Sequence, residues 1–338
     1  MNMPISVSSS RPQATGQRGL TLVELMIAML LGLIILGAVV SVFLANRVSY
    51  NAGENLGRVQ ENARLAFDLM ARDIREAGGS GCGENLTEVN VLNGANAAWW
   101  MTYAGGSAYG VVAFDNAVAY PFRGFGVGER DRAAGTHAIH MSYAAGQGSV
   151  VTAHDFAGTT LTLDANVDGI GTADIAAVCD FARYSIFRVT SVGGAGNTDI
   201  GHASGGGDDE ENGTSDIGTY AINAALYRYN SVGWYVGCNN RVPCDQQGGR
   251  SLYRVALVNA LPAADELIEG VDDMQLEFMV QGANQYVAPA AVVNWATVTA
   301  VRITLDLVGP DAGVTTGAAA DRLTRRVTQT VAIRNRVS

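Results

Sequence analysis

The stretch Arg18-Gly19-Leu20-Thr21-Leu22-Val23-Glu24 opens an apolar run that continues to Ala45. From Leu20 to Ala45 the run holds 26 residues, and Glu24 is its only charged residue. A helix needs about 20 predominantly apolar residues to cross the hydrocarbon core of a bilayer. A carboxylate in such a segment costs about 2.5–3.5 kcal/mol at the bilayer centre and less near its edge. The run therefore predicts a membrane-spanning helix in which Glu24, near one end, needs a functional partner.

The string from Gly19 to Glu24 resembles the class III signal of type IV prepilins. The resemblance implies a basic leader, residues 1–19 with Arg11 and Arg18, that stays in the cytoplasm. It implies that a prepilin peptidase cuts between Gly19 and Leu20 and that the new Leu20 amine is methylated. Most members of the family begin with Phe at the position of Leu20. A cleaved secretory signal is disfavoured, because the apolar region of such a signal is about 7–15 residues long and the run here is longer.

Cleavage at this point gives Glu24 a partner. The new α-amino group would lie four residues before Glu24, so the glutamate of one subunit can meet the Leu20 amine of a neighbour. Such a pair is strong in a low dielectric, and either member is costly if it is left alone. We therefore expect Glu24 to set the axial register between subunits. The alternative is an ordinary membrane anchor whose glutamate lies near the lipid headgroups.

Composition excludes several classes of function. The net charge is −10, which does not suit a protein that binds nucleic acid through phosphates. All 22 Lys and Arg residues are arginine, which excludes a Schiff-base lysine, a P-loop lysine and a Ser-Lys dyad. The sequence contains no nucleophile elbow, dinucleotide fingerprint or zincin motif. We expect no catalytic residue, no enzyme activity and no small-molecule substrate.

The four cysteines all follow the predicted membrane segment, on its exported side, where an even count suggests two disulfides. Three connectivities are open for Cys82, Cys179, Cys238 and Cys244. The short loop between Cys238 and Cys244, with Pro243 in its turn, favours that pair and leaves Cys82 with Cys179. The spacings fit no zinc finger.

Helical periodicity continues after the apolar run. The apolar stripe consists of Leu56, Val59, Ala63, Phe67, Met70, Ile74 and Ala77. With no proline between Pro12 and Pro121, the pattern predicts one helix from Leu20 to Ala77 that stops at Gly78-Gly79. Its first half must lie in lipid or among sister helices, and its second half packs on a sheet.

The rest of the chain predicts strands and glycine-rich loops. The expected strands are 110–114, 138–143, 148–153, 159–163, 175–179, 185–191, 224–230, 233–238, 251–258, 274–281, 299–308 and 328–334. Residues 265–271 predict a short helix or turn, and residues 193–218 a long exposed loop.

Several later motifs resemble PilW-type minor pilins. They are Arg75–Cys82 at the helix end, Cys179-Asp180 with Ser185–Thr190, Gly270–Phe278, Trp295, Ala300–Leu305 and Val331–Arg336. The resemblance implies an α+β, type IV pilin-like fold with a long N-terminal helix on a large antiparallel β-rich head. The expected parts are the leader 1–19, a transmembrane half-helix 20–45, an amphipathic half-helix 46–78 and the head 79–338.

Metal sites are weakly indicated. His137 and His140 would point to opposite faces of a strand and could not share a metal. Asp164, Asn166 and Asp168 resemble the first half of a calcium loop, but Asp174 falls one residue early for the bidentate acid. The acidic run 208–211 is a second, weaker cation candidate. We expect no cofactor and keep calcium as an open alternative.

These observations predict a minor pilin that primes or caps a type IV pilus, with roles in twitching motility, adhesion or DNA uptake. Its partners would be other minor and major pilins, the inner-membrane assembly platform and the prepilin peptidase. The protein would sit in the inner membrane of a Gram-negative bacterium, with its head in the periplasm, and then in the pilus at the cell surface. The alternatives are a J-class pseudopilin of type II secretion and a membrane-anchored enzyme or sensor.

Overall fold

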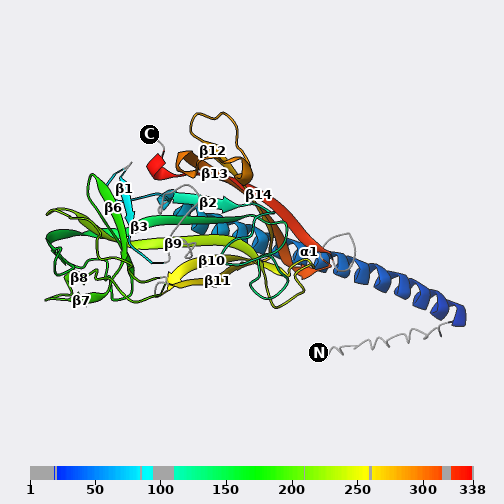
Figure 1. The fold of residues 1–338 in the computed structure, drawn as a ribbon. Coiled ribbons are helices and arrows are strands. Elements are labelled where there is room, and N and C mark those ends of the chain that lie inside the picture. The colour runs from blue at the N-terminus through cyan, green and yellow to red at the C-terminus, as the bar shows by residue number, and fades with distance from the viewer. Residues whose placement is uncertain are drawn as a thin grey trace, which may run out of the picture. The chain divides into compact units, whose positions relative to one another are not determined.

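The computed structural model of the protein describes residue 19 and residues 21–83, 86–93, 110–208, 210–258, 261–313 and 321–336. The chain divides into two compact units, Met1–Asn51 and Ala52–Ser338. Helix α1, Leu22–Glu76, is continuous across the boundary between them. The second unit holds all the described strands and three short 3-10 helices, Pro289–Ala291, Trp295–Thr297 and Arg334–Arg336 (Figure 1). A long apolar N-terminal helix with a large sheet-rich head is the α+β, pilin-like layout that the sequence predicts.

The part of α1 in the first unit is apolar on every side. Its large apolar side chains, from Leu22 to Val48, are between 48% and 75% exposed. Within the described residues, α1 is the one helix long and apolar enough to cross a membrane, judged by length and composition. A helix that is apolar all round is stable only where lipid or other apolar helices cover it.

The part of α1 in the second unit is amphipathic. Val59, Ala63, Phe67, Met70 and Ile74 are buried, at the three- and four-residue spacing that the sequence predicts. The helix ends at Glu76, and Gly78 adopts a left-handed φ of 73°, which a glycine accepts without strain. The Gly78 N–H then donates to the Ser142 carbonyl at 3.0 Å, so the helix end is joined to the sheet.

The larger sheet has eleven strands and is antiparallel except where β1 pairs with β6. Its main path runs β1-β6-β5-β9-β3-β4-β8-β7; off this path, β10 pairs with β9, β11 pairs with β10 and β2 pairs with β3. The strands are β1 Thr87–Asn90, β2 Gly110–Phe114, β3 Ala138–Asp155, β4 Thr160–Leu163, β5 Ile175–Cys179, β6 Arg183–Arg188, β7 Ser191–Gly193, β8 Asp199–Gly201, β9 Ala225–Cys238, β10 Arg250–Val258 and β11 Leu261–Glu269.

The smaller sheet is an antiparallel meander of β12 Val271–Val280, β13 Val298–Ala312 and β14 Arg322–Ala332. One core joins both sheets to the helix: Met70 and Ile74 of α1 cluster with Trp234 of β9 and with Leu276 and Ile303 of the smaller sheet. The amphipathic half of α1 is therefore an integral part of the head.

Four local predictions are wrong. Residues 138–143 and 148–153 form the single strand β3, whose register shifts between Ala145 and Ser149 at a bulge with Gly146 and Gly148 at positive φ. The predicted strands 224–230 and 233–238 likewise form one strand, β9. Residues 265–271 were expected as a helix or turn but extend β11 and start β12, because pairing with β10 overrides a weak local preference. The loop predicted at 193–218 contains β8 and the buried residues Ile200, His202 and Asn212.

Candidate functional site

The start of α1 is shaped by Thr21. Its side-chain Oγ1 accepts a hydrogen bond from the Glu24 backbone N–H at 3.3 Å. Thr21 therefore caps the helix, and Glu24 takes the third helical position, the spacing of a capping box. Glu24 is exposed in the first turn, where the helix dipole favours a negative charge. The backbone of Glu24 is thus part of the helix cap, in addition to the pairing expected of its side chain.

Of the two predicted processing residues, one can be placed. Gly19 is described and exposed, and an added Cβ there would meet nothing within 4 Å. Leu20 lies outside the described residues. The cleavage and methylation of this segment stay predictions.

A buried carboxylate fixes α1 to the larger sheet. Asp73 is 4% exposed, and its Oδ2 accepts from the Trp234 indole N–H at 2.8 Å and from Arg254 Nε at 2.9 Å. Its Oδ1 accepts from Arg254 Nη2 at 3.1 Å and from the Tyr143 hydroxyl at 3.2 Å. Burial, followed by the Asp73 charge, raises the pKa of Tyr143, so the phenol stays a proton donor. The helix is thereby tied to β3, β9 and β10 through a single side chain.

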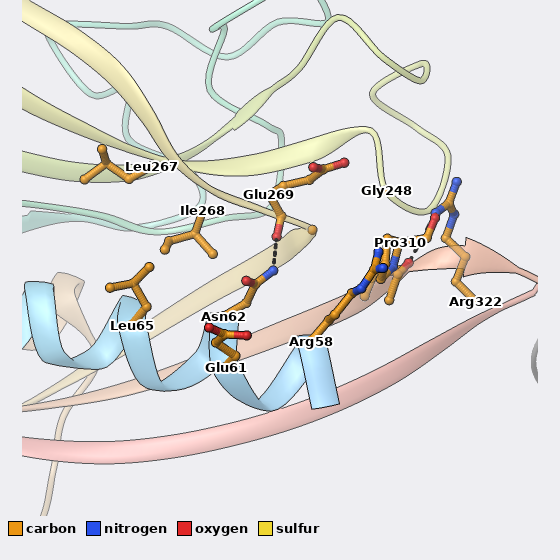
Figure 2. Close-up of a pocket in the computed structure, with 13 residues that line it drawn as sticks. Arg58, Glu61, Asn62, Leu65, Gly248, Leu267, Ile268, Glu269, Pro310 and Arg322 are labelled. Carbon is orange, nitrogen blue, oxygen red and sulfur yellow. Dashed lines mark hydrogen bonds between the residues drawn. The ribbon is translucent and has the colours of Figure 1, made fainter. Parts of the chain in front are cut away.

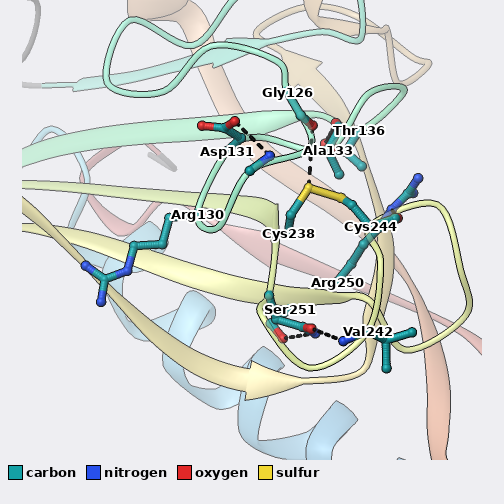
Figure 3. Close-up of a disulfide and its surroundings, with 12 residues drawn as sticks. Gly126, Arg130, Asp131, Ala133, Thr136, Cys238, Val242, Cys244, Arg250 and Ser251 are labelled. Atoms are coloured by element: carbon teal, nitrogen blue, oxygen red, sulfur yellow. Dashed lines mark hydrogen bonds between the residues drawn. A yellow bond between two sulfur atoms is a disulfide. The ribbon is translucent and has the colours of Figure 1, made fainter.

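Two disulfides stabilise the head. Cys82, six residues after α1 ends, is bonded to Cys179 at the end of β5, with a Cα–Cα distance of 5.9 Å. Cys238, at the end of β9, is bonded to Cys244 with a Cα–Cα distance of 5.0 Å (Figure 3). This is the connectivity that the short Cys238–Cys244 loop favours in the sequence. The loop before β3 lies against the second disulfide, because the backbone of Cys238 bonds to Arg130 and Asp131.

The end of α1 and the end of the described chain meet in space. The Asn335 side chain lies 2.8 Å from where a Cβ on Gly79 would be, and the Arg336 guanidinium lies 3.2 Å from the same point on Gly78. The Arg336 Nη1 donates to the carbonyl of Trp295 at 2.6 Å. The glycine pair is therefore needed for close approach of the tail. Both motifs are visible in the sequence, but nothing in them indicates that they touch.

Comparison with known protein families gives two matches. Residues 15–40 match the prokaryotic N-terminal methylation motif, and residues 241–335 match the type IV pilus-assembly protein W family, PilW. The two matches are those of a PilW-like type IV pilin. No curated protein and no solved structure matches the chain.

Through these two matches the chain is similar to components of the type IV pilus, and its N-terminal helix is long and apolar enough to cross a membrane. The PilW region extends from the residues before Cys244 through β14 to Asn335. It includes the whole smaller sheet and the tail residue that covers Gly79.

The region that matches PilW also forms one wall of a cavity of about 350 Å³ beside α1 (Figure 2). Helix residues Arg58, Glu61 and Leu65 line the cavity from one side, and Leu267 and Pro310 line it from the other. The Asn62 side chain spans the edge and donates to the Glu269 carbonyl at 3.1 Å. The cavity mixes charges of both signs with apolar walls, so its lining does not define one ligand.

The calcium candidates of this PilW-like pilin do not form one site. The oxygens of Asp168 accept from the N–H groups of Gln147 and Gly148, and Asp164 accepts from those of Val150 and Ala165. Asn166 bonds to Ile170, and Asp174 pairs with Arg228 at 3.2 Å. Across the described part of the chain, no three His, Cys, Asp or Glu side chains are grouped as a metal would require. Asp209 of the acidic run lies outside the described residues.

His137 lies just before β3 and His140 lies in it, and the two rings have different partners. His137 accepts from the Leu276 N–H, whereas His140 contacts the Tyr120 hydroxyl and Ser231. A different pair is close: the Nε2 atoms of His154 and His202 are 3.1 Å apart. The Tyr220 N–H donates to His154 Nδ1, and His202 Nδ1 contacts the Ser215 carbonyl. Two neutral rings satisfy these contacts, with His154 Nε2–H donating to His202 Nε2.

Proposed function

We propose that this PilW-like pilin is a minor pilin that primes or caps assembly of a type IV pilus. The observation that carries the proposal is the first half of α1, whose apolar surface is exposed on all sides and holds one carboxylate. Such a surface suits a bundle of sister helices, first in the inner membrane and then in the filament. The head, a unit of its own core and two disulfides, would meet other minor pilins.

The proposed role of Glu24 is to pair with the Leu20 amine of a neighbouring subunit after the prepilin peptidase has removed the leader. Exposure of the carboxylate in the first helical turn supports this, because nothing in the described chain forms an ion pair with Glu24. An apolar surround would make the pair strong and would penalise an unpaired glutamate. Subunits would therefore join only in the register that brings the two charges together.

The location follows from the same features. The first half of α1 would hold the protein in the inner membrane, with the head in the periplasm, an oxidising compartment that maintains disulfides. The proposed partners are the other pilins and the assembly platform. The PilW match favours the pilus over the secretion pseudopilus.

The test must separate the charge of Glu24 from its place in the capping box. Glu24→Val removes the carboxylate, whereas Thr21→Val removes the capping hydroxyl and leaves the charge. Both proteins are expressed in a strain that lacks the native copy, and surface filaments are counted by electron microscopy at equal protein level. We expect Glu24→Val to lower the count at least about tenfold. The variant would leave the Leu20 amine of the neighbouring subunit unpaired, and one unpaired charge in apolar surroundings costs more than about 1.4 kcal/mol.

Thr21→Val should leave the count within about twofold, since a cap contributes about 1 kcal/mol to a helix stabilised by its surroundings. Normal filament numbers with Glu24→Val would overturn the pairing. Equal loss in both variants would assign Glu24 to helix capping.

A further inference from the structure

A second cavity, of about 410 Å³, opens where α1 ends. Its walls are the last turns of α1, the glycine turn that follows, the bulge of β3, Tyr227 of β9 and the tail residues Arg334 and Asn335. All of these belong to the second unit. The volume is in the range of pockets that bind ligands.

The cavity carries an excess of positive charge. Arg72, Arg75 and Arg334 line it, and Glu76, at 4.0 Å from Arg72, is the one carboxylate in the lining. No carboxylate of the described residues lies within ion-pair distance of Arg75 or Arg334. Asp168 is next to Gly146 at the rim, but the N–H groups of Gln147 and Gly148 already occupy both of its oxygens.

Several other exposed or half-exposed arginines of the head face acids: Arg326 forms a bidentate pair with Asp306, and Arg228 pairs with Asp174. Arg123 and Arg325 are exposed without such an acid among the described residues, but neither lines this cavity. The chain as a whole has a net charge of −10. A cavity with two uncompensated guanidiniums in an acidic protein attracts an anionic group from outside the subunit.

The cavity walls are held in place before anything binds. The Tyr227 ring lies between two glycines at positive φ, Gly81 and Gly148. A Cβ added to either glycine would lie 2.5 Å from the ring. Asn335 is packed on Gly79, and Cys82 is fixed by its disulfide to Cys179. Binding would therefore order only the arginine side chains, which limits its entropic cost.

We propose that this cavity binds an acidic peptide segment of a neighbouring subunit, with Arg75 and Arg334 pairing with its carboxylates. A guanidinium presents a planar fork that matches a carboxylate, and two such forks in one cavity select two acids on one chain. The Gln147 and Asn335 side chains and the Tyr227 hydroxyl line the same walls and can bond to the peptide backbone. The identity of the partner as a subunit rests on the proposed function.

The experiment uses the full chain in detergent and a fluorescent hexaglutamate peptide as probe, with binding followed by anisotropy. The variants Arg75→Glu and Arg334→Glu reverse the charge inside the cavity. Arg325→Glu makes the same change at an exposed arginine of β14 that does not line the cavity. We expect Arg75→Glu and Arg334→Glu each to weaken binding at least about tenfold, the size of a lost charge-assisted hydrogen bond, and Arg325→Glu less than about twofold.

Three results would overturn the proposal: no binding to the unmodified protein, equal loss in all three variants, or equally tight binding of hexaglutamine. A single-stranded hexanucleotide that binds more tightly than the peptide and is lost with the same variants would assign the cavity to nucleic acid instead. The assay needs no filament. Normal piliation with Glu24→Val would therefore refute the Glu24 pairing and leave the peptide result standing, and a failed peptide assay would leave the Glu24 pairing standing.

Discussion

At the scale of single residues, Asp73 is a buried carboxylate with a full set of donors. It is buried on α1 and receives four hydrogen bonds, two from Arg254, one from Trp234 and one from Tyr143. A carboxylate at this depth is tolerated because all of its partners are donors, one of them charged. The helix is therefore joined to the sheet by a polar interaction as well as by the apolar core.

Asp73→Ala should lower the free energy of unfolding by about 3–5 kcal/mol, because it leaves the Arg254 charge and two further donors without an acceptor. Asp68→Ala is the matched control, since Asp68 is exposed and lies 3.8 Å from Arg64. The control should change stability by at most about 1 kcal/mol. Urea unfolding of the full chain in detergent, followed by tryptophan fluorescence, measures both. Equal effects would show that the Asp73 bonds contribute little.

The imidazole pair predicts a pH dependence. Burial lowers the pKa of His202 to about 4, and burial also lowers the pKa of His154. Between pH 6.5 and 4 the unfolded chain takes up a proton that folded His202 does not, so stability is complete above pH 6.5 and falls as the pH falls. His202 alone should lower the free energy of unfolding by about 3 kcal/mol at pH 4, relative to its value above pH 6.5.

His202→Gln should remove this part of the acid sensitivity. The free energies of unfolding of the variant and the unmodified protein would be measured at pH 7.0, 5.5 and 4.0. The difference between the two proteins should shrink as the pH falls. A constant difference at all three pH values would contradict the assignment.

At the scale of elements, a glycine in α1 and a glycine in β3 have opposite effects on stability. Gly57 is exposed in the helix, and a Cβ there would meet nothing within 4 Å. Gly148 lies in the β3 bulge with φ of 78°, and a Cβ there would be 2.5 Å from the Tyr227 ring. We expect Gly57→Ala to stabilise the head by about 0.5–1 kcal/mol and Gly148→Ala to destabilise it by about 1–3 kcal/mol. Thermal unfolding of the two variants checks the opposite signs, and equal signs would refute the explanation.

Elements with a clear local pattern could be predicted. The helix from Leu22 to Glu76 follows from an apolar run and a stripe, and β2 and β5 have the bounds that their sequences indicate. Strand β11 could not be predicted, because Pro262, Asp265 and Glu266 do not favour a strand and only pairing with β10 defines it. A break was predicted in β3 because of its glycines, which the sheet accommodates in a bulge. A break was predicted in β9 because of its polar residues, of which Ser231 makes a buried contact with His140.

The candidate site was predictable to a smaller extent. The prepilin signal gives Gly19, Leu20 and Glu24, because processing depends on a short contiguous motif. The Asp73 cluster and the cavity between Arg75 and Arg334 join residues far apart in the chain, and no local pattern indicates which of them meet. The capping role of Thr21 was visible in principle, since the spacing Thr21-x-x-Glu24 is that of a capping box.

At the scale of the whole molecule, the two disulfides should differ in their effect on stability. Cys82–Cys179 spans 97 residues and Cys238–Cys244 spans 6. Closing the longer loop restricts the unfolded chain more. Cys82–Cys179 should therefore add about 4–5 kcal/mol to the free energy of unfolding, and Cys238–Cys244 about 2 kcal/mol. The double variants Cys82→Ser/Cys179→Ser and Cys238→Ser/Cys244→Ser, compared by urea unfolding, test this order. A larger loss from the short loop would show that local packing outweighs chain entropy.

The position of the longer disulfide also matters when the molecule is pulled. The bridge begins six residues after the helix ends, so a pull along α1 reaches β5 through a covalent bond. The segment between the two cysteines then cannot lengthen, although at about 3.4 Å per residue it would otherwise release roughly 330 Å of chain. A subunit loaded during retraction of a fibre would keep this part of its head intact until a sulfur–sulfur bond is reduced.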